Sequence, residues 1–396
     1  MSFSQVALST VAEVNPRFDH PANRDLDERV SFVPMANVSA TRGAITKEEE
    51  RSLANVLKGF TPFVDRDVLL AKITPCFENG KIAHARITKR FGFGSTEFHV
   101  IRAQTATLDD RYIYQYLRTP SVRAEGVRRM TGSAGQKRVP KAFLDALLVP
   151  LPSLQEQRRI AAVLDKADAL RVQRRVAIAK LDELLQSVFI EMFGDPLTNS
   201  KGWIIQRLGD ACEKVTVGIV VKPADWYVES GIPAIRSLNI GVNRIIQKNF
   251  VYFNETDNTG PLKKTMLRAG DVVVVRSGQP GKAAVIPPSL DGANAIDVLI
   301  ARTNKEKMLP LFLSYFVNSQ AGKQLVLAEQ RGQVQKHLNV KQLSEAEIPL
   351  PPLDLQNRFA QIAEKIETQK QTMQRAAEKA ETLFASLQHH AFSGKL

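Results

Sequence analysis

Two short stretches of the chain combine basic side chains, side-chain amides and glycine. The first is RRMTGSAGQKR (128–138), which contains no acidic residue, and the second is EQRGQVQKH (329–337). Arginine and lysine can donate hydrogen bonds to guanine, glutamine can pair with adenine, and glycine lets the backbone approach a phosphate. The candidate DNA-binding residues in these stretches are Gln136, Lys137, Arg138, Arg331, Gln335, Lys336 and His337.

A second set of candidates lies on segments that alternate between strand and turn patterns. Glycine and lysine are adjacent in ENGK (78–81) and in SGQPGK (277–282). Each motif alone favours a solvated turn, but the recurrence at equivalent points of two segments favours contact with DNA. The candidates of this set are Lys72, Lys81, Arg236, Arg276, Gln279 and Lys282.

Motifs that would indicate catalysis are incomplete or missing. NPRF (15–18) resembles the NPPF signature of adenine-N6 methyltransferases, but Arg17 stands at the third position and no methyl-donor loop accompanies it, so we interpret it as a turn. SGQPGK is too short for a GxxxxGK[ST] phosphate loop. Histidine and cysteine form no metal-binding spacing. We therefore expect no catalytic residue, no metal site and no cofactor in this chain.

The chain consists of two diverged copies of one unit. VPLPSLQEQRRI (149–160) and IPLPPLDLQNRF (348–359) share six of twelve residues at an offset of 199. GQKRVPKAFL (135–144) corresponds to VQKHLNVKQL (334–343), and VDRDVLLAK (64–72) resembles RAGDVVVVR (268–276). A period of this length indicates internal duplication of a domain with an appendage.

Charge is distributed unevenly along the two copies. The formal net charge of the chain is +13; residues 1–150 and 196–350 each carry +6, whereas residues 151–195 are neutral. A basic excess favours a polyanionic partner such as nucleic acid. No apolar run is long enough for a transmembrane helix, no signal peptide is evident, and two unpaired cysteines fit a reducing compartment. We expect a cytoplasmic protein without membrane contact.

The neutral segments show the three-and-four spacing of coiled-coil helices. We expect both helices to pair with each other in antiparallel orientation, because a globular segment of about 150 residues separates them. Two ordinary helices packed on their own domains are the alternative. The residues predicted at the helix–helix interface are Ile160, Val163, Ala167, Leu170, Leu181, Leu184, Val188, Phe359, Ile362, Ile366, Met373, Leu383 and Leu387.

The globular segments combine strand-like runs with fewer helical stretches. DVVVVRSG (271–278), KIAHARI (81–87) and FHVIRA (98–103) predict strands, and helices are expected around 111–130 and 310–330. We predict an α+β fold of two duplicated mixed α/β domains separated by two long helices. The predicted divisions are 1–150, 151–195, 196–350 and 351–396.

The duplicated architecture and the PLP-x-L-x-x-Q-x-R helix starts resemble the specificity (S) subunit of type I restriction–modification enzymes. Pro150 to Ile160 match the conserved opening of that family well, and Pro349 to Phe359 match it more loosely. The GQK segment and the Phe-Gly end at 193–194 are also similar to that family. The resemblance covers the full chain.

The resemblance implies a non-catalytic subunit that recognises a bipartite double-stranded DNA target. Each globular segment would be a target recognition domain, and the helix pair would set the length of the unread spacer and dock two modification (methyltransferase) subunits. S-adenosylmethionine would bind to those subunits, and ATP and Mg to up to two restriction subunits. Two other interpretations stay open: a coiled-coil scaffold with two protein-binding domains, and a self-sufficient methyltransferase or nuclease. The matched basic charges count against the former and the incomplete motifs against the latter.

Overall fold

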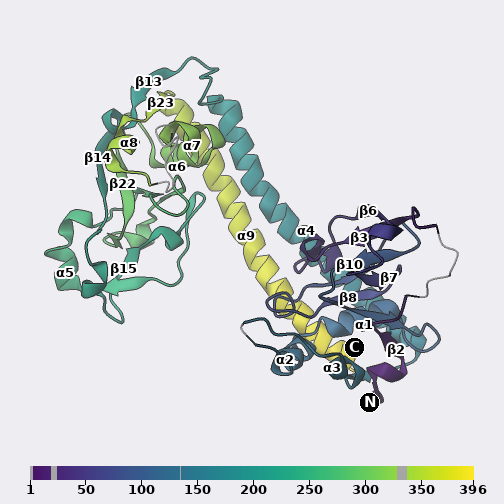
Figure 1. Cartoon of the computed structure of the whole chain (residues 1–396). Helices are drawn as coiled ribbons and strands as arrows, with labels where there is room; N and C mark the ends of the chain where they lie inside the picture. The colour runs from purple at the N-terminus through teal and green to yellow at the C-terminus, as the bar shows by residue number, and fades with distance from the viewer. Residues whose placement is uncertain (1–2, 19–24, 134, 328–336) are drawn as a thin grey trace. The chain divides into compact units, whose positions relative to one another are not determined.

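Two segments of the chain fold into nearly the same order of strands and short helices, and parts of two long helices complete each of them (Figure 1). The computed structural model describes residues 3–18, 25–133, 135–327 and 337–396. Contacts divide the chain into two compact units. The first comprises Met1–Ala177 and Met373–Leu396, and the second comprises Ile178–Thr372.

The described part of the first unit contains two four-stranded sheets and two strand pairs. One sheet is antiparallel with the order β2-β11-β8-β9; the other has the order β6-β3-β10-β7, in which β3 and β10 are parallel. Strand β1 pairs with β12 and β4 with β5. The bounds are β1 Gln5–Ala7, β2 Ala12–Val14, β3 Arg29–Val33, β4 Val38–Ser39, β5 Ala44–Ile45, β6 Glu49–Ser52, β7 Thr61–Phe63, β8 Val68–Ala71, β9 Ile82–His84, β10 Gly92–Gly94, β11 Phe98–Ala103 and β12 Leu148–Pro150.

The second unit repeats this topology. Its antiparallel sheet has the order β14-β22-β19-β20, and the sheet β18-β15-β21 again contains one parallel pair, β15 with β21. Strand β13 pairs with β23 and β16 with β17. The duplication inferred from the sequence is therefore a duplication of fold. The bounds are β13 Ile204–Arg207, β14 Cys212–Val217, β15 Ile232–Ile235, β16 Ile240–Gly241, β17 Arg244–Ile245, β18 Val251–Phe253, β19 Val272–Val275, β20 Ala283–Val285, β21 Asn294–Ala295, β22 Val298–Thr303 and β23 Glu347–Leu350.

The central strands β8 and β19 are buried on both faces, which explains their uninterrupted apolar sequences. Successive strand side chains point to opposite faces of a sheet. Val272 and Val274 accordingly pack into one apolar cluster, together with α6 and the long helices. Val273 and Val275 pack into a different cluster on the other face. A polar residue in β19 would therefore be buried on either side.

Short helices follow the antiparallel sheet in each unit, and polar side chains cap most of them. Asp109 accepts hydrogen bonds from two backbone amides at the start of α1, and Thr119 caps α2. Ser319 caps α7 and separates it from α6, so each predicted helical stretch forms two helices. The bounds are α1 Asp110–Leu117, α2 Pro120–Arg128, α3 Lys141–Asp145, α4 Leu154–Phe193, α5 Glu255–Thr259, α6 Pro310–Asn318, α7 Gln320–Val326, α8 Val340–Glu345 and α9 Leu353–Phe392.

The long helices α4 and α9 begin and end at local signals. The Ser153 hydroxyl accepts a hydrogen bond from the Glu156 amide at 3.3 Å, and Gly194, with φ of 80°, follows the last residue of α4. Helix α9 starts at Leu353, so Asp354 lies inside the first turn and not at the cap position. There its carboxylate still has a favourable position relative to the helix dipole.

Helices α4 and α9 pack antiparallel, as predicted. In the first unit, Arg171 of α4 binds Glu381 near the end of α9. In the second unit, Phe189 near the end of α4 packs against Phe359 near the start of α9, with ring centroids 5.5 Å apart. The early part of each helix thus meets the late part of the other.

The buried side of the helices differs from the predicted stripe. Val163, Leu170, Leu184 and Leu383 are exposed, so their assignment to the helix–helix interface is corrected. The buried side includes polar residues whose groups find partners, among them Lys370, and a pattern of apolar residues cannot identify such positions. Ile160 and Phe359 are buried, and the remaining predicted residues are partly buried: Ala167, Leu181, Val188, Ile362, Ile366, Met373 and Leu387.

Candidate nucleic-acid interface

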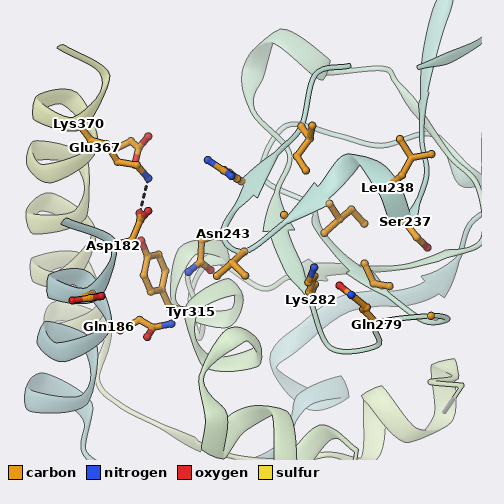
Figure 2. Close-up of a pocket in the computed structure, with 18 of the residues that line it drawn as sticks. Asp182, Gln186, Ser237, Leu238, Asn243, Gln279, Lys282, Tyr315, Glu367 and Lys370 are labelled. Atoms are coloured by element: carbon orange, nitrogen blue, oxygen red, sulfur yellow. Dashed lines mark hydrogen bonds and ion pairs between the residues drawn. The ribbon is translucent and has the colours of Figure 1, made fainter. Parts of the chain in front are cut away.

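A cavity in the second unit gathers polar side chains from several elements (Figure 2). Its volume is about 650 Å³. The hairpin β16–β17 and the turn after β19 line it on the side of the sheets, and α4, α6 and α9 line it on the side of the helices. The labelled lining residues in Figure 2 are Asp182, Gln186, Ser237, Leu238, Asn243, Gln279, Lys282, Tyr315, Glu367 and Lys370.

The hairpin β16–β17 presents Arg244 at the cavity. Its two-residue turn contains Asn243 in the left-handed conformation, with φ of 55°. The Asn243 side-chain oxygen accepts hydrogen bonds from Asn318 at 2.7 Å and from Ser314 at 2.9 Å. Because α6 holds the turn in this way, the exposed Arg244 side chain projects from a fixed base.

The turn after β19 is held by its own backbone. The Gly281 amide donates to the Val275 carbonyl at 3.1 Å, and the Val275 amide donates to the Lys282 carbonyl at 2.8 Å. Gly278 and Gly281 both have φ near 80°, a conformation that favours glycine. Gln279 is exposed at the tip of this turn. The Gln279 side chain is therefore accessible to a ligand.

The two sides of the cavity carry opposite charge. Arg244 and Lys282 lie on the side of the sheets, whereas the helices contribute the acidic residues Asp182, Glu183 and Glu367 and one base, Lys370, and so carry a net negative charge. Burial raises the pKa of the Tyr315 hydroxyl, and the negative charges of Glu367 and Asp182 raise this pKa further. A polyanion would be attracted to the hairpin and the turn and repelled by the helices. DNA contact is therefore expected from the sheet side.

A charged cluster lies at the end of β19. Arg276 forms an ion pair with Asp297 at 3.2 Å and a hydrogen bond with His337. The other ring nitrogen of His337 lies 2.9 Å from the Ser277 hydroxyl. The structure thus brings together two predicted residues, Arg276 and His337, that lie 61 positions apart in the chain.

The first unit contains the equivalent cluster. The Arg138 guanidinium donates to both carboxylate oxygens of Glu97, at 3.0 and 2.8 Å. The hydrogen bond from Arg138 holds the pKa of the Glu97 carboxyl below its usual value, although burial opposes this effect, and the charge of Lys72 adds to the lowering. Gln136 and Lys137 are exposed in the same loop. Each unit therefore pairs one predicted arginine with a carboxylate, and a second predicted residue, Lys72 or His337, lies next to the pair.

Two predicted residues use their charged groups inside their own unit. The Lys81 amine donates to the Met35 carbonyl at 2.9 Å, and the Arg236 guanidinium donates to the Asn249 carbonyl at 2.8 Å. Both contacts stabilise a loop, and DNA contact by these side chains stays a prediction. Arg331, Gln335 and Lys336 lie outside the described residues.

Sequence reasoning missed Glu97, Asp297, Asn243 and Arg244. The two carboxylates occupy equivalent places before β11 and β22, and aligning the two copies around these strands would have found them. The sequence Gly241-Val242-Asn243-Arg244 carries a hairpin signal that could have placed Arg244 at a tight turn.

Neither a metal centre nor a membrane span is found in the described parts of the chain. Among the residues that the structure describes, histidine, cysteine and carboxylate side chains form no group of three that could hold a metal ion. None of the described helices has the length and apolar character needed to cross a bilayer.

Two copies of one α+β fold, each with exposed amide and basic side chains beside a charged cluster, define a duplicated binding module. The family model described as type I restriction modification DNA specificity domain matches residues 10–179 and 200–382, one match in each copy. The chain belongs to this family, which confirms the predicted resemblance.

Named relatives are specificity subunits. The chain is 34% identical over 186 residues to the type I restriction enzyme EcoAI specificity subunit of Escherichia coli, covering 46% of this chain and 31% of that subunit. Similarity to the EcoEI specificity subunit of the same organism has the same coverage at 35% identity. The matches thus span about a third of these relatives' length. The MjaVIII specificity subunit of Methanocaldococcus jannaschii is 21% identical over 320 residues, covering 77% of this chain and 74% of that subunit.

Solved structures share the fold over the whole chain. A chain from work on complex assembly and conformational transition of the type I R-M system superposes with a TM-score of 0.60 at 20% identity, covering 100% of this chain and 98% of that one. The type I restriction-modification system S subunit from M. genitalium gives a TM-score of 0.54 at 13% identity, covering 98% and 96%. These likenesses support the fold class predicted from the sequence.

Proposed function

We propose that the chain is the DNA sequence-specificity subunit of a type I restriction–modification complex and recognises a bipartite double-stranded target. The observation that carries this proposal is the recurrence of one cationic arrangement on two copies of one fold. Each unit presents exposed amide and basic side chains beside a carboxylate that is paired with an arginine. Two equivalent contact surfaces suit two separate DNA segments.

The basic segments and the nearly neutral helical segments have different proposed roles. Residues 1–150 and 196–350 act as target recognition domains, and the helical segments 151–195 and 351–396 set the spacer and dock two modification subunits. The leading candidates for base and phosphate contacts are Gln136 and Lys137 of the first unit and Gln279 and Lys282 of the second. They are favoured because the two lysines are not held in ion pairs in the described structure.

A second group of candidates already forms bonds within the chain. These residues contact DNA only if those bonds break, or if one side chain binds its present partner and DNA together. Arg138 and Arg276 each bind a carboxylate, which lowers their net contribution to phosphate affinity and fixes their geometry. A fixed guanidinium is suited to bidentate pairing with guanine. Lys72 and His337 complete the two clusters, and Arg331, Gln335 and Lys336 extend the candidate surface in sequence.

The proposed subunit supplies recognition and its partners supply chemistry. The modification subunits bind S-adenosylmethionine and methylate adenine, and up to two restriction subunits use ATP and Mg. Metal and methyl donor are therefore expected on the partners.

Methylation-aware sequencing of host DNA, with the gene present and deleted, tests the proposal. Loss of adenine methylation at one split motif on deletion is the expected result. Co-purification of the tagged chain tests the partners independently of host methylation. An unchanged methylome together with co-purifying proteins that contain no methyltransferase would reject the proposal in favour of a protein-binding scaffold.

A further inference from the structure

Each unit contains an ionic triad with a largely buried base at its centre, at the contact between α4 and α9. In the second unit, the Lys370 amine of α9 lies 2.5 Å from the Asp182 carboxylate of α4 and 3.4 Å from Glu367 on its own helix. The Lys370 side chain is only 7% exposed. Figure 2 shows the contact between Lys370 and Asp182. A lysine this deeply buried requires a partner in a fixed position.

The first unit contains the same arrangement with arginine as the base. Arg171 of α4 binds Asp168 on its own helix, with nitrogen and oxygen 2.9 Å apart, and binds Glu381 across the pair. The Arg171 side chain is 13% exposed and its guanidinium carbon lies 4.0 Å from the centre of the Phe384 ring. Arg118, the residue that follows α1, provides a further contact, 2.6 Å from Asp168.

The two triads are related by the sequence repeat. Asp168, Arg171 and Asp182 correspond, at the offset of 199 that relates the helix starts, to Glu367, Lys370 and Glu381. In the contacts of Lys370 with Asp182 and of Arg171 with Glu381, the two residue numbers add up to 552. Arg175, one helical turn after Arg171, also binds Glu381. Both units therefore impose the same antiparallel register on the helices.

We infer that these two triads lock the register of α4 against α9. A slip of one heptad would place Lys370 opposite Phe189 or Arg175, which offer an apolar ring or a like charge. The same slip would place Arg171 opposite Gln374 or Gln388. The apolar contacts alone recur at heptad spacing and tolerate such a slip, whereas buried charges do not. The triads therefore select one register among several of similar apolar content.

The register lock bears on recognition, and this consequence rests on the proposed function. If the helix pair sets the unread spacer, the triads determine its length. The register of the helices is a property of the free chain and is measured without DNA. A wrong inference about the register would appear in that measurement, whereas a wrong proposed function would appear in the methylation and co-purification experiments.

Pulsed electron paramagnetic resonance on the full chain tests the lock. Spin labels are attached at Gln173 of α4 and Lys379 of α9, both exposed, after Cys76 and Cys212 are changed to serine. The parent should give a single distance. The neutral variant Arg171→Met, Glu381→Leu, Lys370→Met, Asp182→Leu should remain folded and show a second distance population, because a one-heptad slip shifts the helices by about 10 Å. A single unchanged distance in this folded variant would overturn the inference.

Charge exchange covers the case in which the neutral variant does not fold. In a chain with Arg171→Met and Glu381→Leu, Lys370→Glu should broaden the distance distribution, and adding Asp182→Lys should restore the single distance. Absence of this rescue counts against the lock. The matched control is the exposed pair Lys141→Met, Asp145→Leu on α3, which lies outside the helix pair and should leave the distance unchanged.

Discussion

Gln356 repeats, bond for bond, the contacts that Gln157 makes in the other half of the chain. The Gln157 side-chain oxygen accepts from the Asp109 amide at 2.8 Å, and its nitrogen donates to the carbonyls of Thr107 and Pro152. The corresponding contacts of Gln356 involve the Leu309 amide and the carbonyls of Lys307 and Pro351. The glutamine of the repeated helix-start motif therefore ties each long helix to the loop before α1 or α6.

Replacing this glutamine should destabilise its own unit. Gln157→Leu leaves one amide and two carbonyls without their partner in a buried place, and we expect a loss of about 3 kcal/mol in the free energy of unfolding. Urea denaturation of the full chain measures the effect. Gln155→Leu, two residues earlier and exposed, is the matched control and should change stability by less than about 0.5 kcal/mol. Equal effects of both substitutions would contradict the prediction.

The turn after β19 should separate base recognition from phosphate affinity. Lys282→Ala is expected to weaken binding to all sequences and to reduce the slope of log affinity against log salt by about 1. Gln279→Ala should instead relax discrimination at one base pair of a single half-site by about 1–3 kcal/mol. Binding measured on half-site variants at several salt concentrations distinguishes the two effects. Lys263→Ala, an exposed lysine outside the cavity, is the control.

Acid sensitivity of the first unit should depend on Asp110. Burial alone would raise the pKa of the Asp110 carboxyl, but hydrogen bonds from His84 and Arg66 outweigh burial and hold this pKa well below its usual value. A carboxyl with a depressed pKa in the folded state contributes stability above its pKa in the unfolded chain, about 3.9, and loses it as the pH falls below that value.

Asp110→Asn should therefore lower stability at pH 7 by about 2 kcal/mol and flatten its dependence on pH below about 4. Thermal unfolding between pH 3 and pH 7 measures both effects. Glu229→Gln, at an exposed site, controls for the loss of one negative charge. An unchanged acid slope in Asp110→Asn would show that another group governs it.

The aromatic contact between the long helices should dominate the stability of the second unit. Phe359 is fully buried against Phe189, Phe193 and Tyr315. Phe359→Ala should cost about 3–5 kcal/mol because it leaves a cavity. Leu383→Ala, at a side chain that is 70% exposed, should cost less than about 0.5 kcal/mol. A large effect of Leu383→Ala on the isolated chain would contradict its exposed placement.

The exposed leucines Leu184 and Leu383 occupy equivalent positions in the two copies, at the offset of 199. If the helices dock modification subunits as proposed, Leu184→Ser or Leu383→Ser should weaken binding of one subunit each, without changing the unfolding midpoint. Native mass spectrometry of the assembled complex counts the subunits. Full assembly of both variants would exclude these leucines from the docking surface.

Much of the fold could be predicted because local pattern and tertiary role agree. The run Val272–Val275 forms a buried strand, Gly194 ends α4, and the repeated PLP segment precedes each long helix. The helix interface was harder, because Lys370 looks like a solvated residue until its distant partner is known. An apolar pattern assigns such a position to the surface and shifts the predicted stripe.

The turns of the candidate site could be predicted from the sequence, but its charged clusters could not. Gln279 and Lys282 lie in one short segment whose glycines indicate a turn. Glu97 approaches Arg138 across 41 residues and Asp297 approaches Arg276 across the end of a strand, and only the sheet topology brings these groups together. Spacing along the chain carries no direct signal for such contacts.

The backbone bonds that hold the turn after β19 have an evolutionary consequence. The turn depends on main-chain groups and on Gly281, where an added Cβ would lie 3.1 Å from Lys323. The exposed Gln279 contributes no side chain to this backbone framework. Mutation at this position can therefore explore new target preferences while the scaffold stays constant, so that a lineage can change what it recognises without first losing a folded protein.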